Sequence, residues 1–352
     1  MRRLWWLATL PWLACSLLVF EANGLTPTSL ASLLIPALFA TLALGRRRLT
    51  IAILTIGLIF IASRFAPTPP NAVQTCTTTT GPLTCDSGAT RWQRVIDERE
   101  ATRAGLSLSG HLGMMRGREF DTFDALLDSS WASLPGAWRG GPNALLLTST
   151  VTHVEALRFR SPREGKRPAI IFLHGFGGLL TLYVEAIARG THGDFDVIAP
   201  ALDPLGAWWT PRGQAVITRT LDALPDDVDR TQVYLVGLSN GGIGASATLA
   251  HPAVAKRFAG VVLLSGVGEL DELTHPPPTR VLLISGTRDV RFRGEWVSSQ
   301  FDALTALGAD VTWRRFDADH FLLLTHATEW TSAFEAWRRS AHEPTARRGS
   351  SP

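Results

Sequence analysis

The hydrophobic and polar positions divide this chain into two parts. Before residue 66, three nearly uninterrupted apolar runs cover residues 4–20, 25–44 and 49–65. A helix rises about 1.5 Å per residue, so a run of about 17 residues spans roughly 25 Å, close to the ~30 Å hydrocarbon core of a bilayer. We therefore expect a transmembrane anchor of about three helices over residues 1–65.

Arginines flank these runs in a pattern that predicts their orientation. Arg2 and Arg3 precede the first run, and Arg46, Arg47 and Arg48 separate the second from the third. Because basic residues in short loops tend to stay in the cytoplasm, three crossings place everything after residue 65 outside it. We expect an integral membrane protein, in contact with the lipid bilayer, whose larger part faces the periplasm or the cell surface. The alternative is a cleaved signal peptide at residues 1–20, which leaves two apolar runs as the anchor.

Residues 66–143 are less regular, although residues 91–104 are charge-rich and have helical spacing, with Trp92, Val95 and Ile96 along one side. Three prolines, a threonine run and Gly81-Pro82 indicate an extended linker up to about residue 90. The rest of this stretch is interpreted as a juxtamembrane segment, and no function is assigned to it.

From residue 144 onward, short β-rich runs alternate with helical stretches. Two early strands are expected within 144–159, and later ones over 169–173, 197–199, 233–236, 261–264, 281–284 and 311–316. Helical spacing is found at 179–189, 212–223, 241–250 and 296–307. This alternation predicts an α/β fold over residues 144–338, with a doubly wound, mostly parallel sheet and helices on both faces. Residues 339–352 are expected to be a disordered tail.

Composition and charge follow the same division. Of the 352 residues, 45% are hydrophobic, and the mean hydropathy is +0.12. Residues 1–65 carry six arginines and one glutamate, a net +5, whereas the rest carries 28 basic and 30 acidic side chains, a net −2. The larger part is therefore too nearly neutral for a nucleic-acid partner. The sequence has no phosphate loop, dinucleotide fingerprint or metal-ligand cluster, so no cofactor and no metal are expected.

The three cysteines lie in two different parts of the sequence. Cys15 lies in the first apolar run and is interpreted as a small buried hydrophobe. Cys76 and Cys85 bracket a polar stretch and stand nine residues apart, with no second pair nearby. They are candidates for a disulfide in an oxidising compartment. The alternative is a pair of free thiols in a loop.

A Gly-x-Ser-x-Gly motif follows one of the expected strands. After 233–236 the chain continues as Gly237-Leu238-Ser239-Asn240-Gly241 and then as an alanine-rich helical stretch. A sharp turn between strand and helix is the setting that presents a nucleophilic serine, and glycines such as Gly237 and Gly241 are needed because the backbones approach closely there. Ser239 is therefore the candidate nucleophile.

A serine hydroxyl needs a base, and the base needs an acid that orients it. Asp289 follows the run 281–284 and His320 follows the run 311–316, so both stand where a strand ends. We expect Asp289 to hold the Nδ1 proton of His320, which takes the proton of Ser239. The neighbouring acids and histidine are interpreted as solvated, loop-shaping or packing residues: Glu295, Asp302, Asp317, Asp319 and His326.

A glycine-rich loop follows the expected strand 169–173. It is His174-Gly175-Phe176-Gly177-Gly178. Glycines such as Gly175 let the backbone approach a substrate, and the N–H groups of Phe176 and Asn240 are candidate donors to a developing oxyanion. His174 is interpreted as a structural residue that orients the loop rather than as a base.

These motifs, in this order, resemble the α/β-hydrolase superfamily of serine hydrolases. The stretch DRTQVYLVGLSNGG at 229–242 is most similar to the dienelactone hydrolase and polyester-depolymerase esterase branches. The resemblance covers about residues 144–338 and implies hydrolysis of an ester, thioester or amide through an acyl-enzyme. The N-terminal segment has no counterpart in the soluble members. About 13 residues separate the runs that end near 267 and begin at 281, too few for the cap domain of many lipases.

The sequence thus predicts a membrane-anchored serine hydrolase, with a carboxylesterase favoured and a small acyl ester as substrate. Trp208 and Trp209 follow the expected strand 197–199 and are candidates to line the acyl pocket, with packing or membrane-interface roles as the alternative. Two further alternatives stay open. One is an acyltransferase or peptidase with the same three residues, and the other is a non-catalytic binding module with a hydrolase fold.

Overall fold

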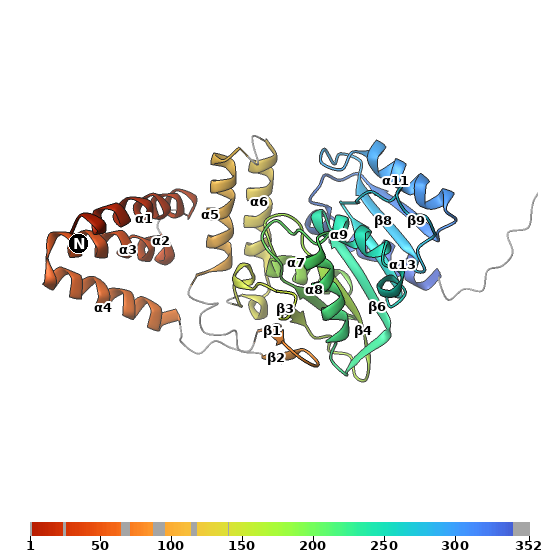
Figure 1. Ribbon diagram of the computed structural model, residues 1–352, viewed down its shortest axis with the longest axis horizontal. Helices are drawn as coiled ribbons and strands as arrows, with labels where there is room; N and C mark the ends of the chain where they lie inside the picture. Colours follow the sequence, from red (N-terminus) through yellow and green to blue (C-terminus); the bar gives the residue numbers. More distant parts are fainter. Residues whose placement is uncertain are drawn as a thin grey trace, which may run out of the picture. The chain divides into compact units, whose positions relative to one another are not determined.

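The computed structural model describes residues 2–23, 26–64, 71–86, 96–113, 118–139 and 141–340 (Figure 1). The chain forms two compact units. The first, called the helical unit, comprises Met1–Asn71 and Ser87–Leu146. The second, called the sheet unit, comprises Ala72–Asp86 and Leu147–Pro352.

The sheet unit is built on one nine-stranded sheet, with the strand order β2-β1-β3-β5-β4-β6-β7-β8-β9. Neighbouring strands among β5, β4, β6, β7, β8 and β9 pair in parallel. At the other edge, β2 pairs with β1, β1 with β3 and β3 with β5, all antiparallel. The strands are β1 (Val73–Thr78), β2 (Thr84–Asp86), β3 (Val154–Phe159), β4 (Arg167–Leu173), β5 (Asp196–Pro200), β6 (Val228–Leu238), β7 (Gly260–Leu264), β8 (Val281–Gly286) and β9 (Val311–Phe316).

The central strands are buried along their whole length. Every residue of β4, β5, β7 and β8 is buried. Strands that are covered on both faces consist of continuous rather than alternating apolar residues, with β-branched side chains favoured. The six apolar runs from residue 169 onward are therefore strands, as predicted. Within 144–159 only β3 forms, and a 3₁₀ turn at Ala144–Leu146 stands where an earlier strand was expected.

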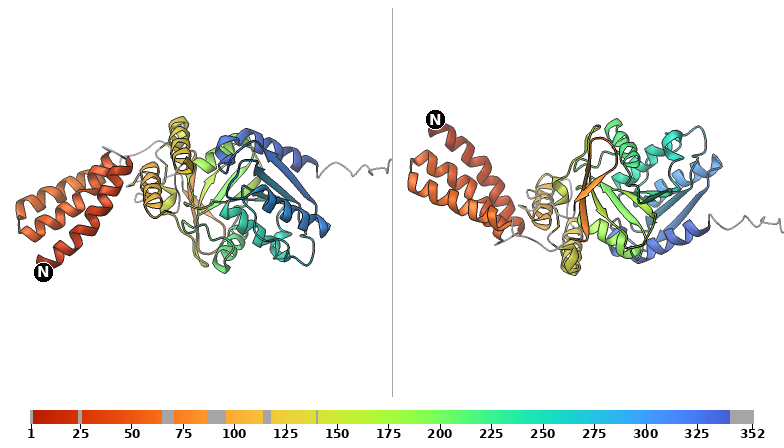
Figure 2. Two further views of the ribbon diagram at one scale, coloured as in Figure 1. Left: turned by 90° about the horizontal axis from the view of Figure 1, so that it is seen from above. Right: turned by 90° about the horizontal axis from the view of Figure 1, so that it is seen from below.

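Helices cover both faces of the sheet, as the two views of Figure 2 show. One group consists of α7, α12 and α13, which contact one another, and another of α8, α9 and α10. The α/β fold with a doubly wound, mostly parallel sheet is thus confirmed. The helices are α7 (Thr181–Gly190), α8 (Pro211–Asp222), α9 (Asn240–Leu249), α10 (Pro252–Ala255), α11 (Gly294–Ala306), α12 (Leu322–Thr325) and α13 (Ala327–Ser340). The expected tail at 339–352 falls almost entirely outside the described residues.

Residues 72–86 are a hairpin of the sheet, whereas their composition predicts a linker. Strand β1 pairs with β3 over six residues, from Val73 with Phe159 to Thr78 with Val154. Cys76 lies directly opposite Cys85 in the hairpin, and the two form a disulfide. Threonine is β-branched and packs well on a half-buried sheet, so the threonine-rich stretch suits an edge strand as well as a loop.

The helical unit contains the N-terminal helices together with two helices that follow residue 96. Helix α1 contacts α3 and α5, α3 contacts α4, and α5 contacts α6. Residues that were expected to be a juxtamembrane segment therefore form helices α5 and α6. The helices are α1 (Arg2–Asn23), α2 (Pro27–Ser32), α3 (Leu34–Leu44), α4 (Arg47–Arg64), α5 (Glu98–His111) and α6 (Arg118–Ser133).

The expected three transmembrane helices over residues 1–65 are not supported. Among the described helices, none combines the length and the apolar character that a bilayer crossing requires. The second apolar run is divided into α2 and α3, because Pro36 in the first turn of α3 cannot donate a hydrogen bond to the carbonyl of Ser32. The Ser16 hydroxyl donates to that carbonyl instead, at 2.8 Å. The third run forms α4, whose 18 residues begin with Arg47 and Arg48 and end with Arg64.

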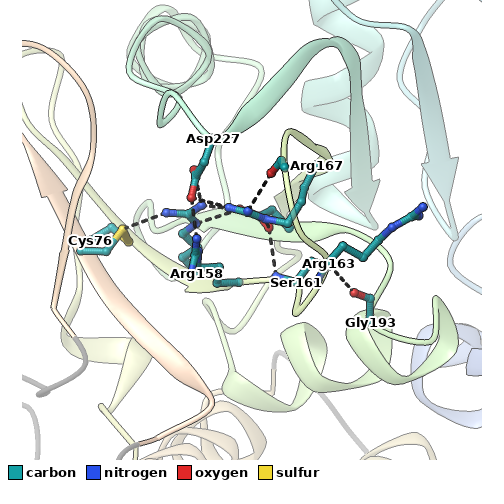
Figure 3. Close-up of polar contacts among 11 residues, drawn as sticks. Cys76, Arg158, Ser161, Arg163, Arg167, Gly193 and Asp227 are labelled. Atoms are coloured by element: carbon teal, nitrogen blue, oxygen red, sulfur yellow. Dashed lines mark hydrogen bonds and ion pairs between the residues drawn. A yellow bond between two sulfur atoms is a disulfide. The ribbon is translucent and has the colours of Figure 1, made fainter.

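Four charged side chains join the amino-terminal ends of the parallel strands. Arg158 of β3 and Arg167 of β4 lie beside Asp227, which precedes β6 (Figure 3). Both arginines also contact Asp196, the first residue of β5. Arg158 Nη2 donates to Asp227 Oδ1 at 2.8 Å, and Arg167 Nε donates to Asp196 Oδ1 at 2.7 Å. Arg158 also contacts Asp196, and Arg167 also contacts Asp227. Two arginines and two aspartates thus meet in a largely buried position, and the exposed Arg160 also pairs with Asp227, at 3.2 Å.

This ion network depends on all four members. Arg158, Arg167 and Asp196 are almost completely buried, whereas about a third of the Asp227 side chain is exposed. Partial burial opposes ionisation of Asp227, but hydrogen bonds from Arg167 and Arg158 outweigh it, and the pKa of Asp227 falls from 3.8 to about 2. Loss of one partner leaves a buried charge uncompensated, which costs more than the intact network contributes.

Replacement of Asp227 by asparagine is expected to lower the free energy of unfolding at pH 7 by about 2 kcal/mol, less than for a fully buried pair because Asp227 is partly solvated. The folded pKa of Asp227 is depressed, so its contribution is present above about pH 4 and is lost as the pH falls toward 2. Urea unfolding at a series of pH values measures the difference in the free energy of unfolding between wild type and Asp227→Asn. This difference should become smaller between about pH 4 and pH 2.

The control for this variant is Asp194→Asn, which breaks an exposed ion pair with Arg163 at 3.4 Å. Exposed pairs contribute about 0–1 kcal/mol. Two results would contradict this interpretation of the network. One is an equal loss of unfolding free energy in the two variants at pH 7, and the other is a loss in Asp227→Asn that stays constant down to pH 2.

Candidate active site

Ser239 stands on the turn between β6 and α9 in a left-handed backbone conformation, with φ at 53°. Such a conformation is strained for a residue with a side chain. Hydrogen bonds hold it: Ser239 N donates to Leu264 O at 2.9 Å, and Ser239 O accepts from Gly242 N at 2.8 Å. The turn raises the Ser239 side chain at the carboxyl edge of the sheet, where ligands of such sheets bind.

The glycines of the motif are required by close backbone approach. A Cβ atom on Gly237 would lie 2.2 Å from Gly241 O, and one on Gly241 would lie 2.1 Å from Leu173 O. No side chain fits at either position. The turn is therefore packed against the end of β4 as well as against its own helix.

The structure brings Ser239, His320 and Asp289 together into one hydrogen-bonded chain. His320 Nε2 lies 3.0 Å from Ser239 Oγ, and His320 Nδ1 lies 2.9 Å from Asp289 Oδ2. With a proton on Nδ1 that donates to the carboxylate, Nε2 is free to accept from the serine hydroxyl. Ser239 and Asp289 are buried, and the His320 side chain is 11% exposed. Bulk water is therefore largely kept from the carboxylate.

Both carboxylate oxygens of Asp289 accept hydrogen bonds. Its Oδ1 accepts from Arg291 N at 2.8 Å and from Phe292 N at 3.0 Å, so Oδ2 is left for His320. The Phe292 ring is stacked on the His320 ring, with centroids 5.9 Å apart and planes 10° apart. One short turn after β8 thus restrains both the carboxylate and the imidazole.

The other acids and the other histidine of this region do not take these places. Asp317 pairs with Arg288, Asp319 Oδ1 accepts from Phe321 N, and His326 Nδ1 contacts Thr325 Oγ1. Glu295 and Asp302 lie on α11. The partner of His320 is Asp289.

The glycine-rich loop 174–178 lies directly against Ser239. A Cβ on Gly175 would lie 3.0 Å from the Cβ of Ser239. His174 Nε2 accepts from Leu202 N at 3.2 Å, so the proton is on Nδ1, which donates to Gly175 O at 2.8 Å. The peptide group is planar and trans, so a Gly175 carbonyl directed at His174 turns the N–H of Phe176 the opposite way.

The second candidate donor comes from the start of α9. Asn240 is the first residue of that helix, and the first N–H groups of a helix have no acceptor within it. The Asn240 side chain donates to Leu205 O at 2.7 Å, which ties this helix start to the loop after β5. Phe176 and Asn240 therefore lie on the two segments that flank Ser239.

His174 is a buried neutral residue that supports the loop. Burial lowers its pKa from 6.5 to about 4, against a smaller opposing effect of the hydrogen bond to the Gly175 carbonyl. Trp208 Nε1 donates to His174 O at 2.9 Å, and its ring packs edge-on against the imidazole. The structural role expected for His174 agrees with these contacts.

The two tryptophans predicted to line an acyl pocket have different surroundings. Trp208 is fully buried and packs against His174 and α9, where a Cβ on Gly244 would lie 2.0 Å from its side chain. It therefore has the packing role and no face toward a substrate. Trp209 is 44% exposed. Trp208 and Trp209 lie in a turn after β5, where the local fold sets the direction of each side chain, and sequence alone does not reveal that direction.

Two features of the site are absent from the sequence-based prediction. Phe292 stacks on His320, and the Leu205 carbonyl holds Asn240. An aromatic residue three positions after Asp289 is a weak local signal for the first. A backbone carbonyl carries no signal in the sequence, so the second could not be found there.

Comparison with known proteins gives similar structures but no similar sequence. No family model and no curated protein matches the chain. A thermostable esterase has a TM-score of 0.42 and 18% identity, and the match covers 53% of this chain and 59% of that protein. The esterase of Pyrobaculum calidifontis has a TM-score of 0.41 and 15% identity over 55% of this chain and 85% of its own. FphF of Staphylococcus aureus, a fluorophosphonate-binding serine hydrolase, has a TM-score of 0.42 and 15% identity, and the match covers 55% of this chain and 94% of FphF.

The buried state of His174 leads to a prediction for the pH dependence of stability. The unfolded chain binds a proton at His174 below about pH 6.5, whereas the folded chain does not until about pH 4. The free energy of unfolding should therefore fall as the pH is lowered through this interval, by up to about 3 kcal/mol from this residue. The variant His174→Asn has no titrating group and should show a flatter profile in denaturant unfolding between pH 7 and 4.

The matched control is His251→Asn, which replaces an exposed histidine on the loop after α9. It should reproduce the wild-type slope. If His174→Asn has that same slope between pH 6.5 and 4, the residue does not stay neutral in the folded protein.

Proposed function

We propose that this chain is a serine hydrolase of the α/β-hydrolase type, a carboxylesterase that works through an acyl-enzyme on Ser239. The observation that carries the proposal is the hydrogen-bonded chain from Ser239 Oγ through His320 to Asp289, at 3.0 and 2.9 Å. The strained turn between β6 and α9 and the order serine, acid, histidine along the chain support the fold type.

The geometry suits acyl transfer in two steps. Ser239 Oγ attacks the carbonyl carbon of the ester while its proton passes to His320 Nε2. The tetrahedral intermediate then expels the alcohol, which takes that proton from His320. A water molecule attacks the acyl-enzyme in the second step, again giving its proton to Nε2, and the acid leaves as Ser239 regains its hydrogen.

The surrounding groups lower the barrier in different ways. Asp289 stabilises the imidazolium that forms at His320 and keeps its Nδ1 proton in place. The N–H groups of Phe176 and Asn240 donate to the developing oxyanion, and one such donor typically contributes ~10²–10³ in kcat. His174 and Trp208 keep the loop in position and act only through it. The chemistry uses side chains and backbone alone.

A fluorophosphonate probe tests the nucleophile. The wild-type protein should be labelled covalently at Ser239 and should hydrolyse p-nitrophenyl acetate, whereas Ser239→Ala should lose labelling and at least about 10⁴-fold of kcat, because the three residues act as a unit. Ser129→Ala removes an exposed hydroxyl of α6 that bonds only within its helix and should leave both unchanged. Equal labelling of Ser239→Ala, or wild-type turnover in that variant, would exclude the assigned nucleophile.

The location of the sheet unit is a separate part of the proposal: it faces the periplasm or the cell surface, and the helical unit attaches the chain to a lipid bilayer. The Cys76–Cys85 disulfide supports an oxidising compartment. Large apolar side chains are exposed along α1 and α4, among them Leu17, Leu54 and Leu58. Exposed apolar side chains in such number favour a membrane or protein partner.

Fusions at one site test the compartment. Alkaline phosphatase folds only where its disulfides form, so a fusion after residue 90 should be active, and a β-galactosidase fusion at the same site inactive. The opposite pattern of the two fusions would place the sheet unit in the cytoplasm.

A further inference from the structure

Exposed apolar side chains in the sheet unit are concentrated in two segments. Among its described residues, five large apolar side chains are exposed: Val151, Leu205, Trp209, Val290 and Trp296. Four of these lie in the segments that follow β5 and β8. The carboxyl ends of parallel strands meet at one edge of a sheet, so both segments are at the edge that carries Ser239.

The segment after β5 is attached to the oxyanion side of the site. Leu205 O accepts from Asn240 Nδ2 at 2.7 Å, and Pro204 O accepts from Gly177 N at 2.7 Å. A Cβ on Gly206 would lie 2.9 Å from Gly175 O. The backbone of Leu205 therefore lies beside both segments that carry the candidate oxyanion donors, and its side chain is 55% exposed.

The segment after β8 is attached to the opposite side of the nucleophile turn. Trp296, on the first turn of α11, donates from Nε1 to Val267 O at 3.1 Å. The residue before Val267 is Gly266, which lies so close to Ser239 that a Cβ there would be 2.2 Å from Ser239 O. Val290 directly follows Asp289 and is 69% exposed. Trp296 and Val290 thus border the site on the side of the acid.

We infer that Leu205, Trp209, Val290 and Trp296 form an apolar rim that selects esters with a long apolar acyl chain. The inference rests on the proposed function and names the substrate class of that same site. Apolar area that is exposed in the free protein is covered when a chain of methylene groups lies across it, and each covered methylene favours the longer ester. Leu205 and Trp296 are the specificity-determining residues, because each exposes apolar side-chain area and belongs to a segment that contacts the turn around Ser239.

Kinetics with p-nitrophenyl esters of two, four and eight carbons test the rim. The wild-type kcat/KM should rise with chain length. Leu205→Ala and Trp296→Ala should each lower the octanoate value by about tenfold, the size expected for lost apolar contact in a binding site, and leave the acetate value within about twofold. Trp296→Phe keeps an aromatic ring without the donor and should retain most of the chain-length preference. Val151→Ala removes an exposed apolar side chain outside the two segments and should keep the wild-type profile.

Two results would overturn the rim. The first is an equal loss for acetate and octanoate in Leu205→Ala and Trp296→Ala, which would mean that these residues only hold the loops in place. The second is a wild-type profile that is flat or falls with chain length while acetate is hydrolysed and Ser239 is labelled. Absence of both hydrolysis and labelling in the wild type would instead refute the proposed function, so the two failures are distinguishable.

Discussion

The left-handed backbone of Ser239 is the constraint around which the sheet unit is arranged. A residue with a side chain at φ 53° costs of order 1–3 kcal/mol, and the surroundings must supply that energy. The end of β4, the end of β7 and the first turn of α9 all meet at this residue, and Gly237 and Gly241 let them approach. The strain serves a purpose, because it directs the hydroxyl away from the helix and toward the imidazole of His320.

The regularity of the sheet explains which parts of the fold were predictable. Strands that are buried on both faces must be continuously apolar, so residues 233–236 or 281–284 can be recognised without any structure. The three residues of the hydrogen-bonded chain were predictable for the same reason, since each follows such a run. Their mutual distances were not, because they depend on how strands far apart in the sequence are ordered in the sheet.

The failures have physical causes as well. The hairpin at 72–86 was missed because a threonine-rich edge strand with a Gly-Pro turn has the composition of a linker, and its partner β3 lies about 80 residues away. The sequence leaves both a pocket role and a packing role open for Trp208, because it does not reveal the direction of a side chain on a loop. The division of the second apolar run follows from one proline, Pro36, whose effect on hydrogen bonding is local and does not alter the hydropathy of the segment.

The disulfide-linked hairpin also determines how one side of the sheet ends. An unpaired strand offers free backbone groups to other chains, and proteins limit this hazard with short or charged outer strands. Here the outermost strand on one side is β2, only three residues long and held by Cys85, while on the other side β9 carries Arg314 and Arg315. A continuous β-ladder from molecule to molecule is thereby disfavoured at both margins, so the sheet can stay extended to nine strands without inviting aggregation.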